Sequence, residues 1–291
     1  MNFKKVLAVL IMILMMSISL TSCGSSDSGD APRNNPDDLL NESSDDMATT
    51  DDASTDDTSD TPSTEAIMED IKSKGKLIVA TEAGFPPMEY YDGDKIVGVD
   101  VDIVNAIAEK LGVEVEFLEL EFNSLIPALN SGKAHLIAAG FSYNEERAEK
   151  VDFSDVYFKS MQVILTKDGS GIDSEESLSG KKVGAQQNTV GDIFITEDVD
   201  CEEKQFYKYM QAVEELKNGA IDAIVVDKVP AEVFVEQNED LIISAELFED
   251  EYGLGINKDQ PEFLGVINET IKELQDSGKI DEFRDKHLKA E

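Results

Sequence analysis

The sequence is poor in the residues that most often carry catalysis, metal binding or cross-linking. Among its 291 residues there are two cysteines, two histidines and no tryptophan. The histidines, His135 and His287, lack the spacing of a metal site, and no nucleophile-elbow, phosphate-loop or paired-cysteine motif occurs. The sequence therefore predicts no metal, no cofactor and no catalytic residue. An enzyme with paired carboxylates stays open, since such a pair leaves no signature in a chain this acidic.

Positive charge is also scarce. Lysine and arginine number 25 against 62 aspartates and glutamates, which gives a formal net charge of −37 at pH 7. A protein of this charge is repelled by phosphates and by anionic lipid headgroups. We therefore expect no nucleic-acid partner and no binding of the protein body to an anionic membrane surface.

The first residues have the pattern of an export signal. Lys4 and Lys5 precede the apolar run 6–20, which is short for a membrane span and typical of a signal-peptide core. The segment Leu20-Thr21-Ser22-Cys23 follows and resembles the bacterial lipoprotein box. The resemblance implies that residues 1–22 are removed and that lipid on Cys23 anchors the protein to the outer face of the cell membrane. A plain secretory signal with a chance cysteine is the alternative.

Residues 23–65 are predicted to be a tether. After Cys23 they are mainly Ser, Asp, Thr, Asn and Pro, with no aromatic residue and with Arg33 as the single basic one. This composition cannot bury enough apolar surface to offset the entropy of ordering, and like charges extend the chain. We expect a disordered acidic segment between the lipid and a folded part that begins near Ala66.

The remainder alternates predicted strands and helices. Residues 113–117 alternate apolar and acidic positions, and 100–111 has one apolar helical face with Gly112 as its stop. Further helices are predicted over 261–276 and 279–287, and further strands over 76–80, 136–139, 161–166, 182–185 and 221–226. This alternation indicates an α/β protein with largely parallel sheets, in which ligands bind beyond the carboxyl ends of strands.

Seven short segments occur in order along residues 66–289. They are Gly84-Phe85-Pro86-Pro87-Met88-Glu89, Val97-Gly98-Val99-Asp100-Val101-Asp102, Leu125-Ile126-Pro127-Ala128-Leu129, Ala139-Gly140-Phe141-Ser142-Tyr143-Asn144-Glu145-Glu146-Arg147, Val151-Asp152-Phe153-Ser154, Gly184-Ala185-Gln186-Gln187-Asn188-Thr189 and Ile221-Asp222-Ala223-Ile224-Val225-Val226-Asp227. Together they resemble the family-3 bacterial solute-binding proteins, which bind polar amino acids for ABC importers. One notable departure is Asn188 where Gly is usual, although Asn tolerates left-handed backbone better than most residues.

The resemblance implies a two-lobed α/β fold of the type II periplasmic-binding-protein kind, with two chain crossovers between the lobes. Lobe 1 would comprise residues 66–158 and 251–291, and lobe 2 residues 159–250. A ligand held by groups from both lobes has a higher affinity for the closed arrangement, which is the requirement for ligand-driven closure.

The resemblance also implies how the α-carboxylate of an amino acid is held. Arg147 matches the family's arginine for this group, and a guanidinium suits it because it binds a carboxylate with two parallel hydrogen bonds. Gly140 and Ser142 match positions that bind the ligand's backbone groups. Thr189 and Val190 open a helix after a strand, and their free N–H groups suit an anion.

Asp227 matches the family's acidic partner for the ligand ammonium, at the carboxyl end of a strand. Asp222, five residues earlier, is expected to be structural.

Five further positions match those that contact the ligand side chain. Phe85 and Phe122 would clamp it, whereas Glu82, Gln186 and Val226 would face its variable end. A carboxylate at Glu82 favours a cationic or amide side chain over an acidic one.

We therefore expect an extracytoplasmic binding component of an ABC importer, which closes on a polar, preferably basic or amide-bearing, amino acid. Its partners would be the free amino acid, the permease subunits of the importer and the membrane that holds the lipid, and the protein would act as a monomer. A cyclohexadienyl-dehydratase-like enzyme on the same fold and a ligand-sensing module for a signalling partner are the alternatives.

Overall fold

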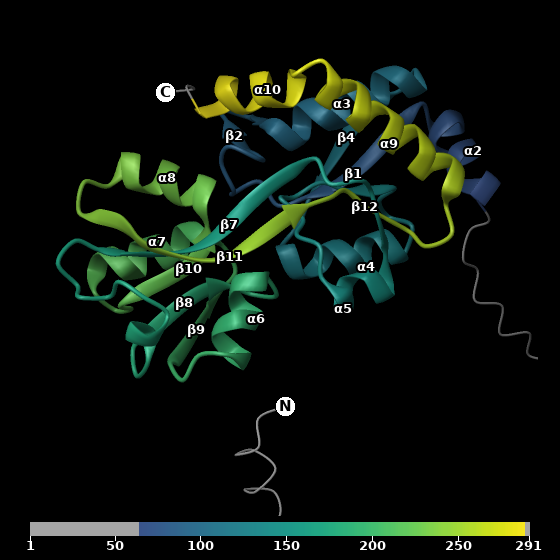
Figure 1. Cartoon of the computed structure of the whole chain (residues 1–291). Helices are drawn as coiled ribbons and strands as arrows, with labels where there is room; N and C mark the ends of the chain where they lie inside the picture. Colours follow the sequence, from purple (N-terminus) through teal and green to yellow (C-terminus); the bar gives the residue numbers. More distant parts are fainter. Residues whose placement is uncertain (1–63, 289–291) are drawn as a thin grey trace, which may run out of the picture. The chain divides into compact units, whose positions relative to one another are not determined.

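The computed structural model describes residues 64–288 (Figure 1). The predicted signal peptide, Cys23 and the tether up to residue 63 lie outside this range. Helix α2 (Thr64–Lys74) opens the described part, two residues before the expected start. Among residues 64–288, no helix has the length and apolar content needed to cross a membrane.

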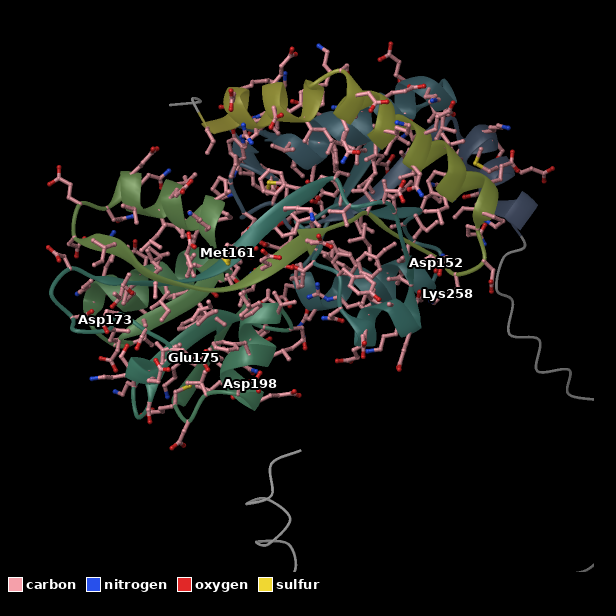
Figure 2. All side chains as sticks on the ribbon, in the orientation of Figure 1. Asp152, Met161, Asp173, Glu175, Asp198 and Lys258 are labelled. Carbon is pink, nitrogen blue, oxygen red and sulfur yellow. The ribbon has the colours of Figure 1, made fainter. Side chains whose placement is uncertain are left out.

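The first sheet has five strands in the order β4-β1-β5-β12-β6. They are β1 (Lys76–Thr81), β4 (Glu114–Glu119), β5 (Leu136–Ile137), β6 (Asp152–Phe153) and β12 (Gly255–Ile256). β1 is parallel to β4 and β5, whereas β12 runs antiparallel to β5 and β6. Beyond β12, Nζ of Lys258 lies 3.2 Å from Oδ1 of Asp152 in β6 (Figure 2). This ion pair links the segment that follows β12 to β6, a strand from a much earlier part of the sequence.

Helices cover both faces of the first sheet. The elements are α3 (Val99–Leu111), α9 (Pro261–Asp276) and α10 (Lys279–Leu288), which pack together with α2 in Figure 1, and α4 (Leu125–Asn130) and α5 (Glu145–Lys150), which lie across the sheet from them. Neighbouring residues of β1 face opposite ways. Val79 belongs to the apolar core that includes α2, α3 and α9, and Ala80 to the smaller core that includes α4. A short hairpin, β2 (Tyr90–Asp92) and β3 (Lys95–Val97), precedes α3.

The second sheet has the order β11-β7-β10-β8-β9. Its strands are β7 (Phe158–Lys167), β8 (Lys182–Gln186), β9 (Glu202–Phe206), β10 (Ala223–Asp227) and β11 (Leu241–Tyr252), and its helices are α6 (Val190–Glu197), α7 (Tyr209–Asn218) and α8 (Lys228–Gln237). Ile224 and Val226 of β10 pack in the core that includes α7 and α8, whereas Val225 packs in the core that includes α6. Every residue of β10 is buried, as expected for a central strand covered on both faces.

Two long strands connect the sheets. The chain leaves the first sheet after β6 along β7 and returns along β11 to β12. β7 and β11 pair antiparallel from Phe158 and Tyr252 at one end to Lys167 and Leu241 at the other, and two bulges interrupt β11. The chain therefore passes between the sheets twice. The lobe boundaries expected at 158/159 and 250/251 stay a prediction.

The predicted α/β class is confirmed, and the predicted helix over 261–276 matches α9. The expectation of largely parallel sheets is only half right. It holds for β4-β1-β5 and for β10-β8-β9, but β7, β11 and β12 pair antiparallel. β7 and β11 run antiparallel to each other because β7 carries the chain out of the first sheet and β11 carries it back.

Gly98, between β3 and α3, provides a stability prediction. Its φ is 142°, and a Cβ there would lie 2.0 Å from the carbonyl oxygen of Met88. Gly98→Ala is therefore expected to lower the free energy of unfolding by about 3 kcal/mol or more, as measured by urea unfolding. The control is Gly265→Ala inside α9, where no atom beyond the neighbouring residues and the helix's own backbone lies within 4 Å of the added Cβ. That change should raise stability by up to about 1 kcal/mol. Equal stability of the two variants would contradict the prediction.

Candidate functional site

A cavity lies between the two sheets, near the carboxyl ends of β1, β5, β8 and β10. Its lining residues are Glu82, Phe85, Glu89, Phe122, Ala139, Gly140, Ser142, Gln186, Thr189, Tyr209 and Asp227. We call it the central cavity. All the predicted ligand-contacting residues belong to this set except Arg147, Val190 and Val226, the last of which packs in an apolar core. The position agrees with the rule for α/β sheets, in which strand ends supply the binding groups.

Glu82 follows β1 directly and contributes a buried carboxyl group to the wall. Its Oε2 accepts a hydrogen bond of 3.2 Å from Nε2 of Gln186, which comes from the second sheet. Its Oε1 lies 3.4 Å from Nζ of Lys208, which also binds Glu119 at 3.0 Å. Burial raises the pKa of Glu82, and the contacts with Gln186 and Lys208 oppose this shift. Because Lys208 pairs with both Glu82 and Glu119, it neutralises the negative charge of Glu82 only in part.

Phe85 and Gly140 shape another part of the wall. Gly140 has a φ of 49°, and a Cβ there would lie 2.8 Å from Cε1 of Phe85. The Phe85 ring therefore rests on the backbone of Gly140, and it also stacks on the ring of Tyr209 of α7, with ring centroids 5.5 Å apart. Phe122 also lines the cavity, and its ring centroid lies 5.1 Å from Cζ of Arg147.

Arg147 lies beside the central cavity rather than in its lining. Its Nη1 donates to the carbonyl of Ser142 at 2.6 Å, and its Nη2 donates to the carbonyl of Asn188 at 2.7 Å. Its side chain is buried, and no carboxylate among the described residues lies within 4.0 Å of it. Burial lowers its pKa to about 10, so it stays a cation at neutral pH. A buried cation whose hydrogen-bond acceptors are only carbonyls can accept an anion.

The N-terminus of α6 lies next to these groups. Asn188 has a φ of 61°, so it adopts the left-handed conformation that the sequence indicated it could tolerate. Thr189 caps the helix by accepting a hydrogen bond from the Asp192 amide at 3.2 Å, and it lines the central cavity. Val190 does not line that cavity and lies instead at a more open one, with Asn144 and Phe194.

Asp227 ends β10, and its neighbour Asp250 of β11 was not predicted. The Tyr252 hydroxyl donates to Oδ1 of Asp227. Burial and then the charge of Asp250 raise the pKa of Asp227 to about 8. Ser142 and Gln162 both donate to Oδ2 of Asp250, at 2.8 and 3.1 Å. Asp227 lines the cavity, and Asp250 is a second buried carboxyl group close to it, outside the lining.

Besides Glu82 and Asp227, the lining contains a third carboxyl group, that of Glu89, which was not predicted from the sequence. It is 1% exposed, and its Oε2 has no hydrogen-bond partner among the described residues. Burial, followed by the neighbouring Asp100, raises its pKa well above the usual range. Asp100 itself accepts hydrogen bonds from the Gly140 amide, at 2.9 Å, and from the Tyr157 hydroxyl, at 2.7 Å.

A signal for Asp250 was available in the sequence. In β11, Asp250 and Tyr252 are buried, whereas Glu249 is exposed and Glu251 partly exposed. This is the two-residue period of a strand, and it puts Asp250 on the same face as the aromatic Tyr252. Because acidic residues surround Asp250 in the sequence, the segment resembles exposed surface, and the alternation of buried and exposed positions is hard to recognise. Asp222, by contrast, is exposed at the start of β10, where its Oδ2 accepts from the amide of Lys182 at 2.8 Å.

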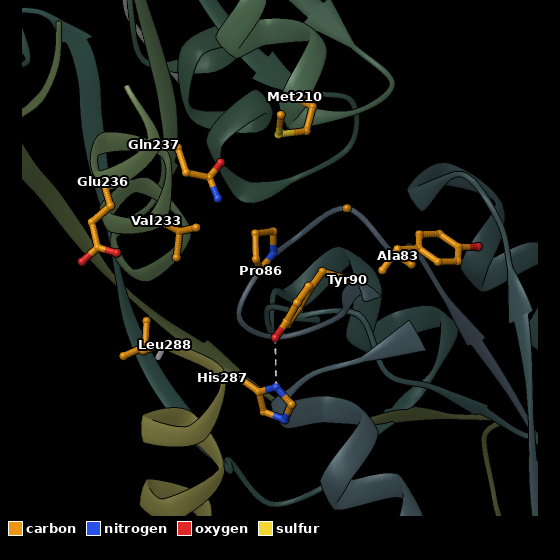
Figure 3. A pocket seen from close by; sticks show the side chains of 11 residues that line it. Ala83, Pro86, Tyr90, Met210, Val233, Glu236, Gln237, His287 and Leu288 are labelled. Carbon is orange, nitrogen blue, oxygen red and sulfur yellow. Dashed lines mark hydrogen bonds between the residues drawn. The ribbon is translucent and has the colours of Figure 1, made fainter. Parts of the chain in front are cut away.

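A larger cavity of about 820 Å³ lies elsewhere, between the segment 83–91, helices α7 and α8, and the end of α10 (Figure 3). At its wall the Tyr90 hydroxyl lies 3.1 Å from Nδ1 of His287. Its one acidic lining residue is Glu236, and no arginine or lysine lines it. The central cavity, beside which a cation and several carboxyl groups converge, is therefore the better candidate for a charged small ligand.

Comparisons with known proteins point to one family. The family model described as "Bacterial extracellular solute-binding proteins, family 3" matches residues 77–290. The "Arginine-binding extracellular protein ArtP" of Bacillus subtilis is 34% identical over 232 residues, 75% of this chain and 88% of that protein. The "ABC transporter glutamine-binding protein GlnH" of the same species is 32% identical over 229 residues, 76% and 84% of the two chains. The solved arginine-bound form of truncated ArgBP from T. maritima is 40% identical with a TM-score of 0.69, over 71% of this chain and 99% of that one.

The chain belongs to the bacterial extracellular solute-binding proteins of family 3. The predicted family and fold are thus confirmed. The family is one of binding proteins rather than enzymes, which agrees with the prediction that this chain is not an enzyme.

Proposed function

We propose that this family-3 protein binds a basic amino acid, such as arginine, in the central cavity and delivers it to an ABC importer. The observation that carries the proposal is the charge around this cavity. Arg147 is a buried cation beside it, and Glu82, Glu89 and Asp227 supply carboxyl groups to its wall. The backbone of any amino acid brings one carboxylate for Arg147 and one ammonium for Asp227, whereas a basic side chain brings a second cation for Glu82, which shares Lys208 with Glu119. The similarity to arginine-binding relatives supports the same class.

The backbone groups of the ligand would lie at one end of the cavity. The carboxylate would accept hydrogen bonds from Arg147 and from the N-terminus of α6, where Thr189 and Val190 begin the helix. The ammonium would donate to Asp227 and to the carbonyl of Gly140. Ser142 Oγ, whose own proton is donated to Asp250, can act as an acceptor for the ammonium.

The side chain of the ligand would extend towards Glu82 and Gln186, between the rings of Phe85 and Phe122. Groups from both sheets would thus contact the ligand. We propose that each sheet with its helices is one lobe, divided at 158/159 and 250/251, and that the ligand stabilises the closed arrangement of the two. The protein would act as a monomer.

The ligand proposal is tested by comparing arginine with citrulline, which has nearly the same shape but a neutral side chain. We expect arginine to bind more tightly, and Glu82→Gln to weaken arginine binding by about 10- to 100-fold while changing citrulline binding little, because a charge-assisted hydrogen bond becomes a neutral one. Titration calorimetry measures both. The control is Glu116→Gln, which alters only an exposed ion pair with Lys76. Tighter binding of glutamate than of arginine would refute the proposal.

The lipid anchor is a separate proposal, supported by the sequence around Cys23. Cys23→Ala is expected to move the protein from the membrane fraction into the medium or periplasm, because the acyl chains have no other attachment site in the lipoprotein box. Arginine binding should be unchanged. The control is Cys201→Ala, since Cys201 is partly buried in the folded part and should not affect anchoring. Membrane retention of the Cys23 variant in a fractionation experiment would show that the anchor lies elsewhere.

A further inference from the structure

Glu82 is a buried carboxyl group that its neighbours hold only weakly. It is 2% exposed, and its Oε1 has no hydrogen-bond partner among the described residues. Two side chains from the part of the chain that forms the second sheet reach it. Nε2 of Gln186 lies 3.2 Å from Oε2, and Nζ of Lys208 lies 3.4 Å from Oε1, which is long for a hydrogen bond. A buried carboxylate normally needs closer partners than these.

Both of these donors are held more closely by another acceptor. Nε2 of Gln186 donates to the carbonyl of Tyr207 at 2.8 Å. Nζ of Lys208 donates to Oε1 of Glu119, the last residue of β4, at 3.0 Å. The side chains of Lys208 and Glu119 are partly exposed, and neither residue is among those that line the central cavity. Glu82 therefore receives the weaker share of each donor.

We propose that Glu119 is a positioning residue that determines the preference of the site for a cationic side chain. It holds the Lys208 ammonium away from Glu82, which leaves negative charge on Glu82 available to the ligand. Without the charge of Glu119, the flexible side chain of Lys208 can close the remaining distance and pair fully with Glu82. A ligand cation would then have to displace Lys208 and would be repelled by it. The inference rests on the proposed function and assigns part of its specificity to a pair of residues outside the cavity lining.

The ratio of the affinities for arginine and citrulline separates this role from a structural one. Lys208 lies between β9 and α7, whereas Glu82 and Glu119 belong to the part of the chain that forms the first sheet. The ion pairs of Lys208 therefore also link the two parts. Loss of that link weakens the binding of arginine and citrulline alike and cancels in the ratio. A change in the charge that faces the ligand side chain alters arginine binding alone.

The experiment is titration calorimetry with arginine and with citrulline, at pH 8, which is above the usual pKa range of carboxyl groups. The proteins are the wild type, Glu119→Gln, Lys208→Met and the double variant. We expect Glu119→Gln to lower the arginine-to-citrulline ratio by about 3- to 10-fold, because Lys208 then competes for Glu82. Lys208→Met should keep or raise the ratio of the wild type. In the Lys208→Met background, Glu119→Gln should change the ratio by less than about twofold, because Glu119 acts only through Lys208.

The matched control is Glu116→Gln, which removes a charge from the same strand. Glu116 pairs with Lys76 at 2.6 Å, and its replacement should leave the ratio within about twofold. An unchanged ratio in Glu119→Gln would overturn the inference. So would a ratio in Lys208→Met below that of the wild type, or an equal decrease on loss of Glu119 with and without Lys208, since Glu119 would then act through its charge at a distance. A wild-type protein that binds citrulline as tightly as arginine would instead contradict the proposed function itself.

Discussion

Arg147→Ala is expected to weaken arginine binding by about two to four orders of magnitude. In the proposed complex the variant leaves the ligand carboxylate in a closed cavity without its cation, which typically costs about 3 to 5 kcal/mol. Arg147 also connects the carbonyl of Ser142, in the segment after β5 of the first sheet, with that of Asn188, just after β8 of the second. Its loss therefore removes a contact that holds the cavity closed. Titration calorimetry with arginine gives the change.

Two further changes on helix α5 control this prediction. Arg147→Lys keeps the charge, but a single ammonium cannot reproduce the geometry of a guanidinium bound to two carbonyls and a carboxylate, so an intermediate loss is expected. Lys150→Ala removes an exposed lysine that pairs with Glu146 and should leave affinity within about twofold. Near-normal binding by Arg147→Ala would refute the assignment of the carboxylate site.

Asp227→Asn should also weaken arginine binding strongly, by about 100-fold or more. The neutral amide has the shape of the protonated carboxyl group, so the fold should be preserved. It cannot become an anion when the ammonium arrives, and the ligand charge is then left without its partner. Calorimetry measures the loss in affinity, and thermal melting of the unliganded variant should show a melting temperature equal to or above that of the wild type, because no buried charge is added.

The matched control for this change is Asp222→Asn, one residue before the same strand. Asp222 accepts a hydrogen bond from Lys182 at the far end of β10 from the cavity. Its replacement should lower stability slightly and leave arginine affinity within about twofold. A larger loss of affinity from Asp222→Asn than from Asp227→Asn would show that the ammonium site was assigned to the wrong aspartate.

The parts of the site that follow strand ends could be predicted from the sequence. Glu82, Gln186 and Asp227 each stand at or just after the end of a parallel strand, where an α/β sheet gathers its ligand-binding groups. Arg147, predicted to hold the ligand carboxylate, lies beside the lining, and its guanidinium is turned towards two carbonyls and lies over the rings of Phe122 and Phe141. Such side-chain orientation depends on packing between segments distant in the sequence.

Some residues of the site and some strands could not be predicted from the sequence, for two physical reasons. Glu89 and Asp250 are buried acids in a chain where acids are abundant, so composition gives no reason to single them out. The strands β11 and β9 were not predicted as strands. Two bulges break the alternation of β11, and β9 is a polar edge strand with no fully buried residue. Tyr209 reaches the cavity from a helix and has no strand-end position to mark it.

The late position of β12 in the chain determines the order in which the molecule can fold during synthesis. β12 lies between β5 and β6, yet it follows all five strands of the second sheet in the sequence. A nascent chain that ends before Gly255 can therefore assemble the second sheet, whose strands are all present, but not the first. We expect the first sheet to acquire protease resistance only after α9 has also emerged. The part of the molecule that holds Glu82 and Arg147 would thus be the last to become native, and ligand could assist folding only at this final step.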